Sequence, residues 1–263
     1  MVPASVRSAG LAGAGVAVIG YAGSVFNNPS GIALIRYLSV EAGASQLPDR
    51  TTYLMGAGAL RIGPIDVGGG YQYLNFSDTA SVRDNILWVG TLVYRRGLTA
   101  LGGSLKYVSV EDTTGQIFRT VTGDLGVTLA FFDIAALALS VQNIAPQAVS
   151  GPRLELPRST HLGFTLNFVD PQAEQWRLLA TVEGIWTAGQ RGRTVAGIEG
   201  GVVLGAVGLV GRMGYGNQPE GFPATRTTYG AGIVLGQVRI DYAYQGKNAF
   251  GNNVHWVGVR WTP

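Results

Sequence analysis

Cysteine is absent from this 263-residue sequence, and charged residues are scarce. Without cysteine the chain has neither a disulfide framework nor a thiolate metal site, which fits a bacterial envelope protein. Asp, Glu, Lys and Arg make up 13% of the residues, against roughly a quarter in an average protein. The formal charge of +3 is too small and too scattered to predict binding to nucleic acid.

Long apolar runs are also missing outside one N-terminal stretch, and the mean hydropathy is only +0.21. This excludes a bundle of transmembrane helices. Glycine is abundant, at 40 residues or about twice its usual share, and there are 11 tyrosines. The composition describes a β protein whose apolar residues are spread along the chain, so the periodicity decides what kind.

Short segments alternate with a period of two, which indicates half-buried strands. In "QVRIDYAYQ", Val238, Ile240 and Tyr242 point one way, and Arg239 and Asp241 point the other. The segment 86–95 is ambiguous because both of its faces are largely apolar. About fourteen strands are predicted, near 36–46, 52–62, 65–76, 85–95, 100–111, 117–132, 134–144, 160–169, 176–187, 194–204, 206–216, 226–235, 237–246 and 253–262.

The lengths of these strands and of their connections favour a membrane barrel. Strands of roughly 9–11 residues cross a tilted bilayer, and bacterial outer-membrane barrels have an even strand count. Even-numbered connections are short, except the fourth near 170–175, whereas odd-numbered ones at 77–84, 145–159, 216–225 and 246–253 are longer. We therefore predict an all-β, antiparallel transmembrane β-barrel of about 14 strands in the bacterial outer membrane, with both termini periplasmic. A soluble β-sandwich or a lipocalin-like barrel is the alternative.

The stretch between Arg7 and Arg36 carries no charge and contains the turn-like "SVFNNPSGIALI" at 24–35. Its glycines oppose a transmembrane helix, since each costs up to ~1 kcal/mol in a helix. A signal peptide with Arg7 in its n-region is a second reading. An ordinary surface turn is a third.

The segment "SAGLAGAGVAVIGYAGSVFNNPSGIALI" resembles the N-terminal segment of the long-chain fatty-acid transporter (FadL) superfamily, especially its PorV/PorQ branch. That resemblance implies a plug that folds into the barrel lumen, so that residues 1–35 form the plug and 36–263 the barrel. Inward residues are mostly small (Gly43, Gly68, Ala138, Gly163, Gly201 and Gly232), and a fourteen-strand lumen is too wide for them to fill. The residues expected in the plug turn are Phe26, Asn27, Asn28, Pro29, Ser30 and Gly31.

Polar residues of mixed charge lie on the predicted inward faces, where we expect them to form an ion-paired network that holds the plug. They are Glu41, Asp66, Lys106, Asp124, Arg177, Glu183, Glu199, Arg212, Arg239 and Asp241. A selective polar pore is the alternative role. His161 and His255 lie on distant strands without metal-ligand spacing, and no GxSxG elbow occurs. We therefore predict no enzyme, cofactor or metal.

Two functions follow from the resemblance and from the short chain. The PorV/PorQ branch resembles accessory barrels of type IX secretion, which implies a plugged barrel that binds other envelope proteins in a complex while embedded in outer-membrane lipid. The alternative is a channel for small hydrophobic solutes. The short loops leave little material for an outer capture groove, and so favour the partner-binding role.

Overall fold

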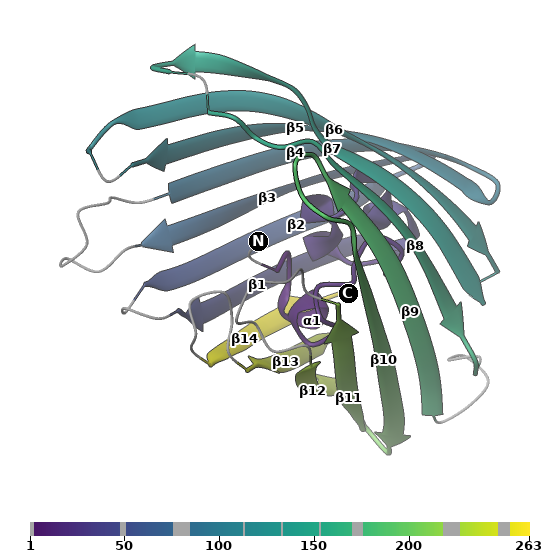
Figure 1. Cartoon of the computed structure of the whole chain (residues 1–263). Coiled ribbons are helices and arrows are strands. Elements are labelled where there is room, and N and C mark those ends of the chain that lie inside the picture. The colour runs from purple at the N-terminus through teal and green to yellow at the C-terminus, as the bar shows by residue number, and fades with distance from the viewer. Residues whose placement is uncertain are drawn as a thin grey trace.

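The computed structural model describes residues 3–47, 51–75, 85–112, 114–132, 134–152, 154–169, 176–217, 227–246 and 253–263. They form a closed barrel of fourteen antiparallel strands, each paired with its neighbours in sequence (Figure 1). The first and last strands close the barrel, with Val40 opposite Trp261 and Gln46 opposite His255. The predicted fold class is therefore confirmed.

The elements follow one another in a simple order. A four-residue helix and two 3₁₀ helices precede the barrel: α1 (Val6–Ala9), η1 (Ala22–Phe26) and η2 (Pro29–Leu34). The strands are β1 (Leu38–Gln46), β2 (Thr52–Ile62), β3 (Ile65–Asn75), β4 (Asn85–Arg96), β5 (Thr99–Glu111), β6 (Ile117–Phe131), β7 (Ala135–Ser150), β8 (Ser159–Asn167), β9 (Trp176–Thr187), β10 (Arg193–Leu204), β11 (Val207–Gly216), β12 (Thr227–Leu235), β13 (Val238–Gln245) and β14 (Val254–Trp261).

Thirteen of the fourteen strands have bounds within two residues of those predicted, and β7 is the exception. It continues to Ser150, so the first six residues of the expected loop 145–159 belong to a strand. Three register shifts, two of which are described below, let β7 stay paired with β6 beyond position 144. The division into segments 1–35 and 36–263 stays a prediction.

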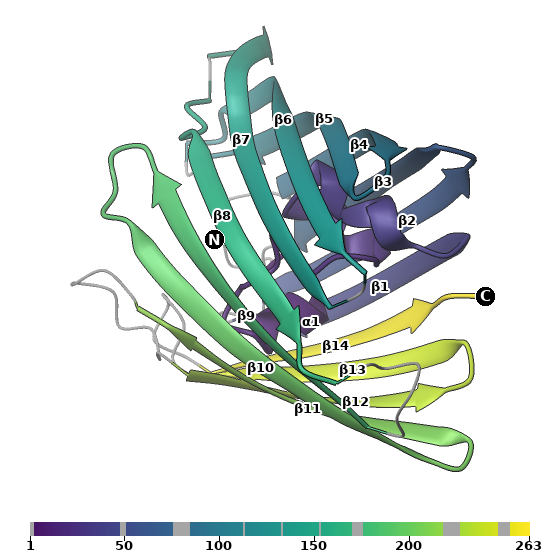
Figure 2. The same cartoon turned by 90° about the vertical axis from the view of Figure 1, so that its right-hand side faces the viewer.

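The two ends of the barrel differ in their connections. Gly63–Pro64, Gly97–Leu98, Gly205–Ala206 and Gly236–Gln237 link consecutive strands at the end where the chain terminates, which we call the turn end (Figure 2). Glycine at positive φ begins each of these two-residue turns, where other residues would be strained. We call the opposite end the loop end. The connections predicted at 77–84 and 170–175 lie outside the described residues, as do most of 216–225 and 246–253.

Apolar side chains cover the outer face of the barrel, and the inner face packs on the N-terminal segment. Leu105 on the outer face is 69% exposed, whereas its neighbour Lys106 is buried. The ambiguous strand β4 is apolar on both faces for a physical reason: Val89 and Val93 point inward and pack in one cluster with Val25 of η1. Among the described residues, no helix is long and apolar enough to cross a membrane.

Candidate functional site

The N-terminal segment lies inside the barrel, as both views show (Figures 1 and 2). We call residues 3–35 the plug, and most of them are buried. Ser5 caps α1, because its hydroxyl accepts a hydrogen bond from the Ser8 amide. The helix packs on β12, β13 and β14, whereas η1 and η2 pack on β1 to β6. The plug therefore contacts both halves of the barrel wall.

The plug turn is built around Asn28 and Pro29. The Asn28 side chain accepts a hydrogen bond from the Ser30 amide at 3.1 Å and caps η2, with Pro29 in the first turn. Asn28 Nδ2 donates to the Val16 carbonyl at 2.9 Å and to Thr128 Oγ1 of β6 at 3.2 Å. Ser30 Oγ lies 2.8 Å from the same Thr128 hydroxyl. Thr128 thus holds two residues of the turn against the wall.

Glycines on the inner wall make room for this turn. An added Cβ at Gly102 of β5 would lie 2.5 Å from the Ser30 nitrogen. At Gly126 of β6, which is opposite Gly102 in register, an added Cβ would overlap Asn28 Oδ1. Gly70 of β3 accommodates the Phe26 ring in the same way. The wall and the turn are therefore complementary in shape at three positions.

Val6 of α1 fills a similar hollow where the barrel closes. A Cβ added at Gly258 of β14 would lie 2.7 Å from Val6 Cγ2, and one at Gly43 of β1 would lie 3.1 Å from it. These two glycines face each other in the β1–β14 ladder. One plug side chain thus bridges the first and last strands.

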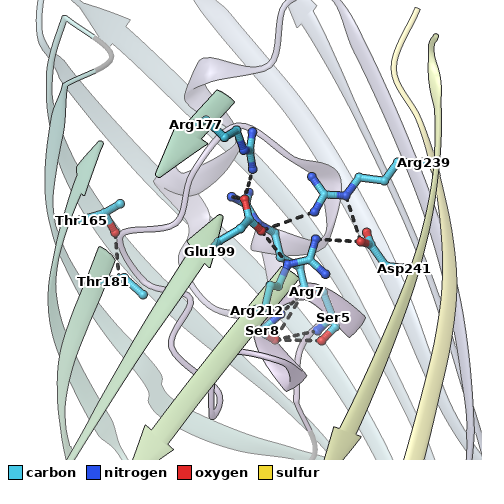
Figure 3. Close-up of polar contacts among 10 residues, drawn as sticks. All are labelled: Ser5, Arg7, Ser8, Thr165, Arg177, Thr181, Glu199, Arg212, Arg239 and Asp241. Carbon is cyan, nitrogen blue, oxygen red and sulfur yellow. Dashed lines mark hydrogen bonds and ion pairs between the residues drawn. The ribbon is translucent and has the colours of Figure 1, made fainter. Parts of the chain in front are cut away.

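A buried ionic cluster ties the plug to β9–β13 (Figure 3). Glu199 of β10 is fully buried and accepts hydrogen bonds from Arg7 of the plug at 2.9 and 2.8 Å. It also pairs with Arg177, with Arg212 Nε at 2.6 Å and with Arg239 at 3.4 Å. Asp241 pairs with Arg212 Nη2 at 2.7 Å and with Arg239 Nε at 2.9 Å. Five members of the predicted lumen network meet in this cluster.

Glu183 of β9 makes a second anchor between the plug and the wall. Its Oε2 accepts the amides of Gly15 and Val16 at 2.7 and 3.0 Å, and its Oε1 lies 2.7 Å from His161 Nδ1. Glu41 of β1 makes a third, because its carboxylate accepts the Gly23 amide at 3.2 Å.

The remaining predicted residues pair with the wall instead of the plug. Lys106 Nζ and Asp124 Oδ2 are 2.6 Å apart, on neighbouring strands. Asp66 lies between Arg61, at 3.3 Å, and Arg95, at 2.5 Å. The predicted set thus divides into the Glu199 cluster, two further plug anchors, the Lys106–Asp124 pair and Asp66 with its two arginines.

Sequence reasoning missed several residues of this site. Arg7, considered above as part of a signal peptide, lies in the Glu199 cluster. The Arg7 and Arg260 guanidinium groups both lie over the Tyr21 ring, at 5.5 and 5.7 Å from its centroid. Thr128 and His161 carry no signal in the sequence beyond their positions in strands. A lone arginine at the edge of a charge-free stretch was a signal for a buried partner on the wall.

The pairing of β6 with β7 is irregular near the loop end. On β7 six residue steps separate Val141 from Gln147, but their partners on β6, Leu125 and Val121, are four steps apart. Asn143 adopts a positive φ of 58° within this stretch. The two extra residues form β-bulges, which interrupt ladder hydrogen bonding. We call this stretch the β6–β7 seam.

Side chains replace part of the lost ladder at the seam. Asp124 Oδ1 accepts the Asn143 amide at 2.9 Å, and Thr122 Oγ1 donates to the Ile144 carbonyl at 3.1 Å. Beside the seam, Gln142 Nε2 donates to the Asn27 carbonyl of the plug turn at 2.5 Å. The seam is therefore held by side chains and is joined to the plug turn.

An apolar groove of 690 Å³ runs along the wall beside the seam. Glycines on the outer faces of β4, β5 and β6 leave the groove open because they have no side chains, and larger apolar side chains flank them. The lining includes Val67, Gly90, Leu92, Gly103, Leu105, Gly123, Leu125 and Ile144, together with the inward-facing Thr91, Ser104 and Asp124. The groove thus lies where the barrel wall is least regular.

No group of three potential metal ligands occurs among the described residues. His161 is engaged with Glu183 and Ser159, and His255 with Tyr242 on the outer face. The Ser159–His161–Glu183 chain has the hydrogen-bond order of a catalytic triad, but all three side chains are buried, and Glu183 also holds two plug amides. The chemistry of the described lumen is hydrogen bonding, ion pairing and packing.

Comparison with known proteins identifies the fold. No protein-family model and no curated protein sequence matches the chain. Solved structures do match, over nearly the full length of both chains. The CymD monoaromatic hydrocarbon channel has a TM-score of 0.70 at 14% identity, with 100% of this chain and 98% of that chain covered.

Two further matches come from named bacteria. The toluene transporter TbuX of Ralstonia pickettii has a TM-score of 0.66 at 11% identity, with 98% of each chain covered. A FadL homologue of Pseudomonas aeruginosa has a TM-score of 0.61 at 12% identity, with 100% of this chain and 99% of that chain covered. This chain therefore shares its fold with the CymD channel, the TbuX transporter and the FadL homologue, and it forms a closed barrel of fourteen antiparallel strands preceded by an N-terminal segment.

Proposed function

We propose that the protein is a bacterial outer-membrane channel for small hydrophobic solutes, closed at rest by its plug. The observation that carries this proposal is the match over the full chain to solved structures described as toluene transporters and monoaromatic hydrocarbon channels. The outer face supports placement in a bilayer, because apolar side chains such as Leu105, Leu125 and Ile198 are exposed there. The C-terminus and the turn end would face the periplasm, whereas Pro3 lies inside the lumen beside Tyr53, toward the loop end.

The apolar groove in the barrel wall supports the proposed substrate class. The apolar groove beside the β6–β7 seam has room for a molecule of monoaromatic size. The inner wall near it carries Thr91 and Ser104, whose hydroxyls bond each other at 2.7 Å, so they are satisfied without a ligand. A small apolar solute gains by leaving such a lumen for the groove and the lipid, since apolar burial is favourable.

The seam supplies the point of passage in this proposal. Thr122 and Asp124 hold it through side-chain hydrogen bonds, each worth about 0.5–1.5 kcal/mol, rather than through a continuous ladder. Gln142 joins the seam to the plug turn, so a displaced turn would loosen the seam as well. Plug and wall would then open together.

The partner-binding alternative of a type IX-like accessory barrel receives less support. It rests on the PorV/PorQ resemblance and the short chain, and the matching solved structures named above are described as transporters and channels. The outer-membrane setting and the envelope partners stay predictions, as does the PorV/PorQ branch. The buried Ser159–His161–Glu183 hydrogen bonds support a role in holding the plug, because Ser159 is fully buried and Glu183 binds the Gly15 and Val16 amides.

A disulfide staple across the seam tests the proposal, because the chain has no cysteine of its own. Gly123→Cys with Ile144→Cys places the pair opposite each other at the seam, and Val127→Cys with Leu139→Cys is the matched control in the regular part of the same ladder. Uptake of toluene into oil-loaded liposomes should be blocked by the oxidised seam pair and restored by reduction. The control pair should transport in both states.

Equal toluene uptake by wild-type liposomes and protein-free liposomes, measured under conditions limited by the membrane, would refute the channel. Uptake that both staples leave unchanged would refute passage at the seam. Co-purification of a stoichiometric envelope protein without any uptake would favour the accessory role instead.

A further inference from the structure

The Glu199 cluster, taken together with the adjoining Arg260 of β14 and Glu41 of β1, which lie opposite each other, has more positive than negative groups. Among the described residues, five guanidinium groups meet three carboxylates there. The guanidiniums belong to Arg7, Arg177, Arg212, Arg239 and Arg260, and the carboxylates to Glu41, Glu199 and Asp241. The difference, five minus three, leaves two positive charges in a largely buried setting.

The pairing of residues across neighbouring strands adds to this excess of positive charge. Arg260 of β14 lies opposite Glu41 of β1 on one side and opposite Arg239 of β13 on the other. Two like charges directly opposite each other destabilise a sheet. Arg239 itself pairs with Asp241 and Glu199, which it shares with Arg212. The carboxylates are therefore divided among more cations than they can neutralise.

Other described carboxylates of the lumen are engaged elsewhere. Asp66 is held by Arg61 and Arg95, Asp124 by Lys106, and Glu183 by His161 and two plug amides. None of these contacts belongs to the cluster. Buried charge without a counter-charge costs several kcal/mol, so the excess calls for an anion.

The cluster also presents donors that the protein leaves unused. Arg212 Nη1 and Arg177 Nε are buried and have no hydrogen-bond partner among the described residues. The Arg212 side chain is fully buried, so its free donor does not face bulk solvent. A guanidinium with a free donor is well suited to bind an oxyanion.

An anion could reach the arginine cluster from the turn end of the barrel. Arg177 lies one residue from the start of β9 at that end, and its side chain is 35% exposed. Val203 of β10, which shares the inward parity of Glu199, is 49% exposed. An anion entering from the turn end therefore meets Arg177 first.

We propose that the arginine cluster binds a compact divalent oxyanion, of the phosphate or sulfate class, through Arg177, Arg212 and Arg260. Two negative charges match the excess of two. Because Arg7 of the plug belongs to the same cluster, a bound oxyanion stabilises the plugged form by relieving repulsion between the wall arginines and Arg7. The site would thus make plug retention depend on anion concentration, whatever solute the barrel carries.

Thermal unfolding in detergent tests this site with inorganic phosphate, and separately with sulfate, replacing chloride at constant ionic strength. The melting temperature of the full-length protein should rise by about 5–10 °C at a hundredfold excess over the dissociation constant. Arg177→Gln should lose this shift, yet fold normally, because Glu199 keeps three other arginine partners. Arg119→Gln, an exposed position on β6 away from the cluster, is the matched control and should keep the shift.

An equal rise with chloride would overturn the proposal, because it would show general screening and no site. A full shift in Arg177→Gln would do the same. Calorimetric titration of phosphate into the wild-type protein tests the site independently of any variant, and the absence of saturable binding there would refute it.

Discussion

Gly102→Ala should open the plugged barrel without unfolding it. The new Cβ would lie 2.5 Å from the Ser30 nitrogen and 2.7 Å from the Pro29 carbonyl carbon, where ordinary contact begins near 3.4 Å. Both atoms are backbone, so no side-chain rotation relieves the overlap. The turn must retreat by about 0.9 Å, which is the difference between 3.4 and 2.5 Å.

That retreat breaks the hydrogen bonds that hold the turn to the wall. They join Asn28 to Thr128, Ser30 to Thr128 and Gln142 to Asn27. At about 0.5–1.5 kcal/mol each, their loss weakens the plug by about 1.5–4.5 kcal/mol. Every 1.4 kcal/mol is a factor of ten in an equilibrium, so the open population should rise by roughly 10- to 1000-fold. The strand ladder is unaffected.

Single-channel recording in planar bilayers measures this open population directly. Gly58→Ala is the matched control, because Gly58 of β2 has no atom within 4 Å of an added Cβ and does not line the groove. Wild type and the control should be mostly closed, and Gly102→Ala should show frequent openings. A Gly102→Ala channel as quiet as the control would show that the turn does not rest on this glycine.

Four further predictions concern the plug, the wall and the loops. Deleting residues 8–35 should leave a barrel with heat-modifiable gel mobility that conducts steadily, and a deletion no more conductive than full-length protein would contradict the plug. Leu105→Arg places a charge on the outer face and should lower the free energy of unfolding in lipid by about 2–4 kcal/mol at the bilayer midplane. His255→Arg lies one residue from the end of β14 and should lower it by about 0–1 kcal/mol. Equal losses for the two variants would refute this depth assignment. Tags inserted within 154–158 should be accessible on intact cells and tags at Pro64 should not, and the reverse labelling would invert the topology. The Thr114 hydroxyl and the Gln116 amide hold the pKa of Asp112 below its usual range, so the order of this loop should persist above the unfolded pKa and be lost as pH falls through the folded pKa. Amide exchange at Thr114 and Gln116, whose amides bond the Asp112 carboxylate, measures this, and Asp112→Asn should remove the dependence.

The sequence was sufficient to predict the barrel because its physical cause is local. Alternation at Arg239, Ile240 and Asp241 marks which face of β13 looks inward, and the structure buries Arg239 and Asp241 while exposing Ile240. Glycine-led turns such as Gly63–Pro64 mark the strand ends in the same way. These signals need only a few neighbouring residues.

The candidate site could be predicted only in part, because its contacts join distant segments. Alternation places Glu199 in a polar network, but its pairing with Arg7 spans 192 positions. Gly102 and Gly126 resemble any other strand glycines until the turn is placed against them. The β6–β7 seam escapes prediction because Asn143 and Ala145 occupy positive φ with no glycine to announce it. Nothing in a period-two pattern reports two extra residues in one strand.

The Val6 contact with Gly43 and Gly258 has a consequence for barrel closure. Val6 packs on the lumen side of both glycines, which face each other in the β1–β14 ladder. A plug that contacts the first and the last strand together favours the closed ladder over an open one. The segment that blocks the lumen should therefore also act as a template on which β1 and β14 pair.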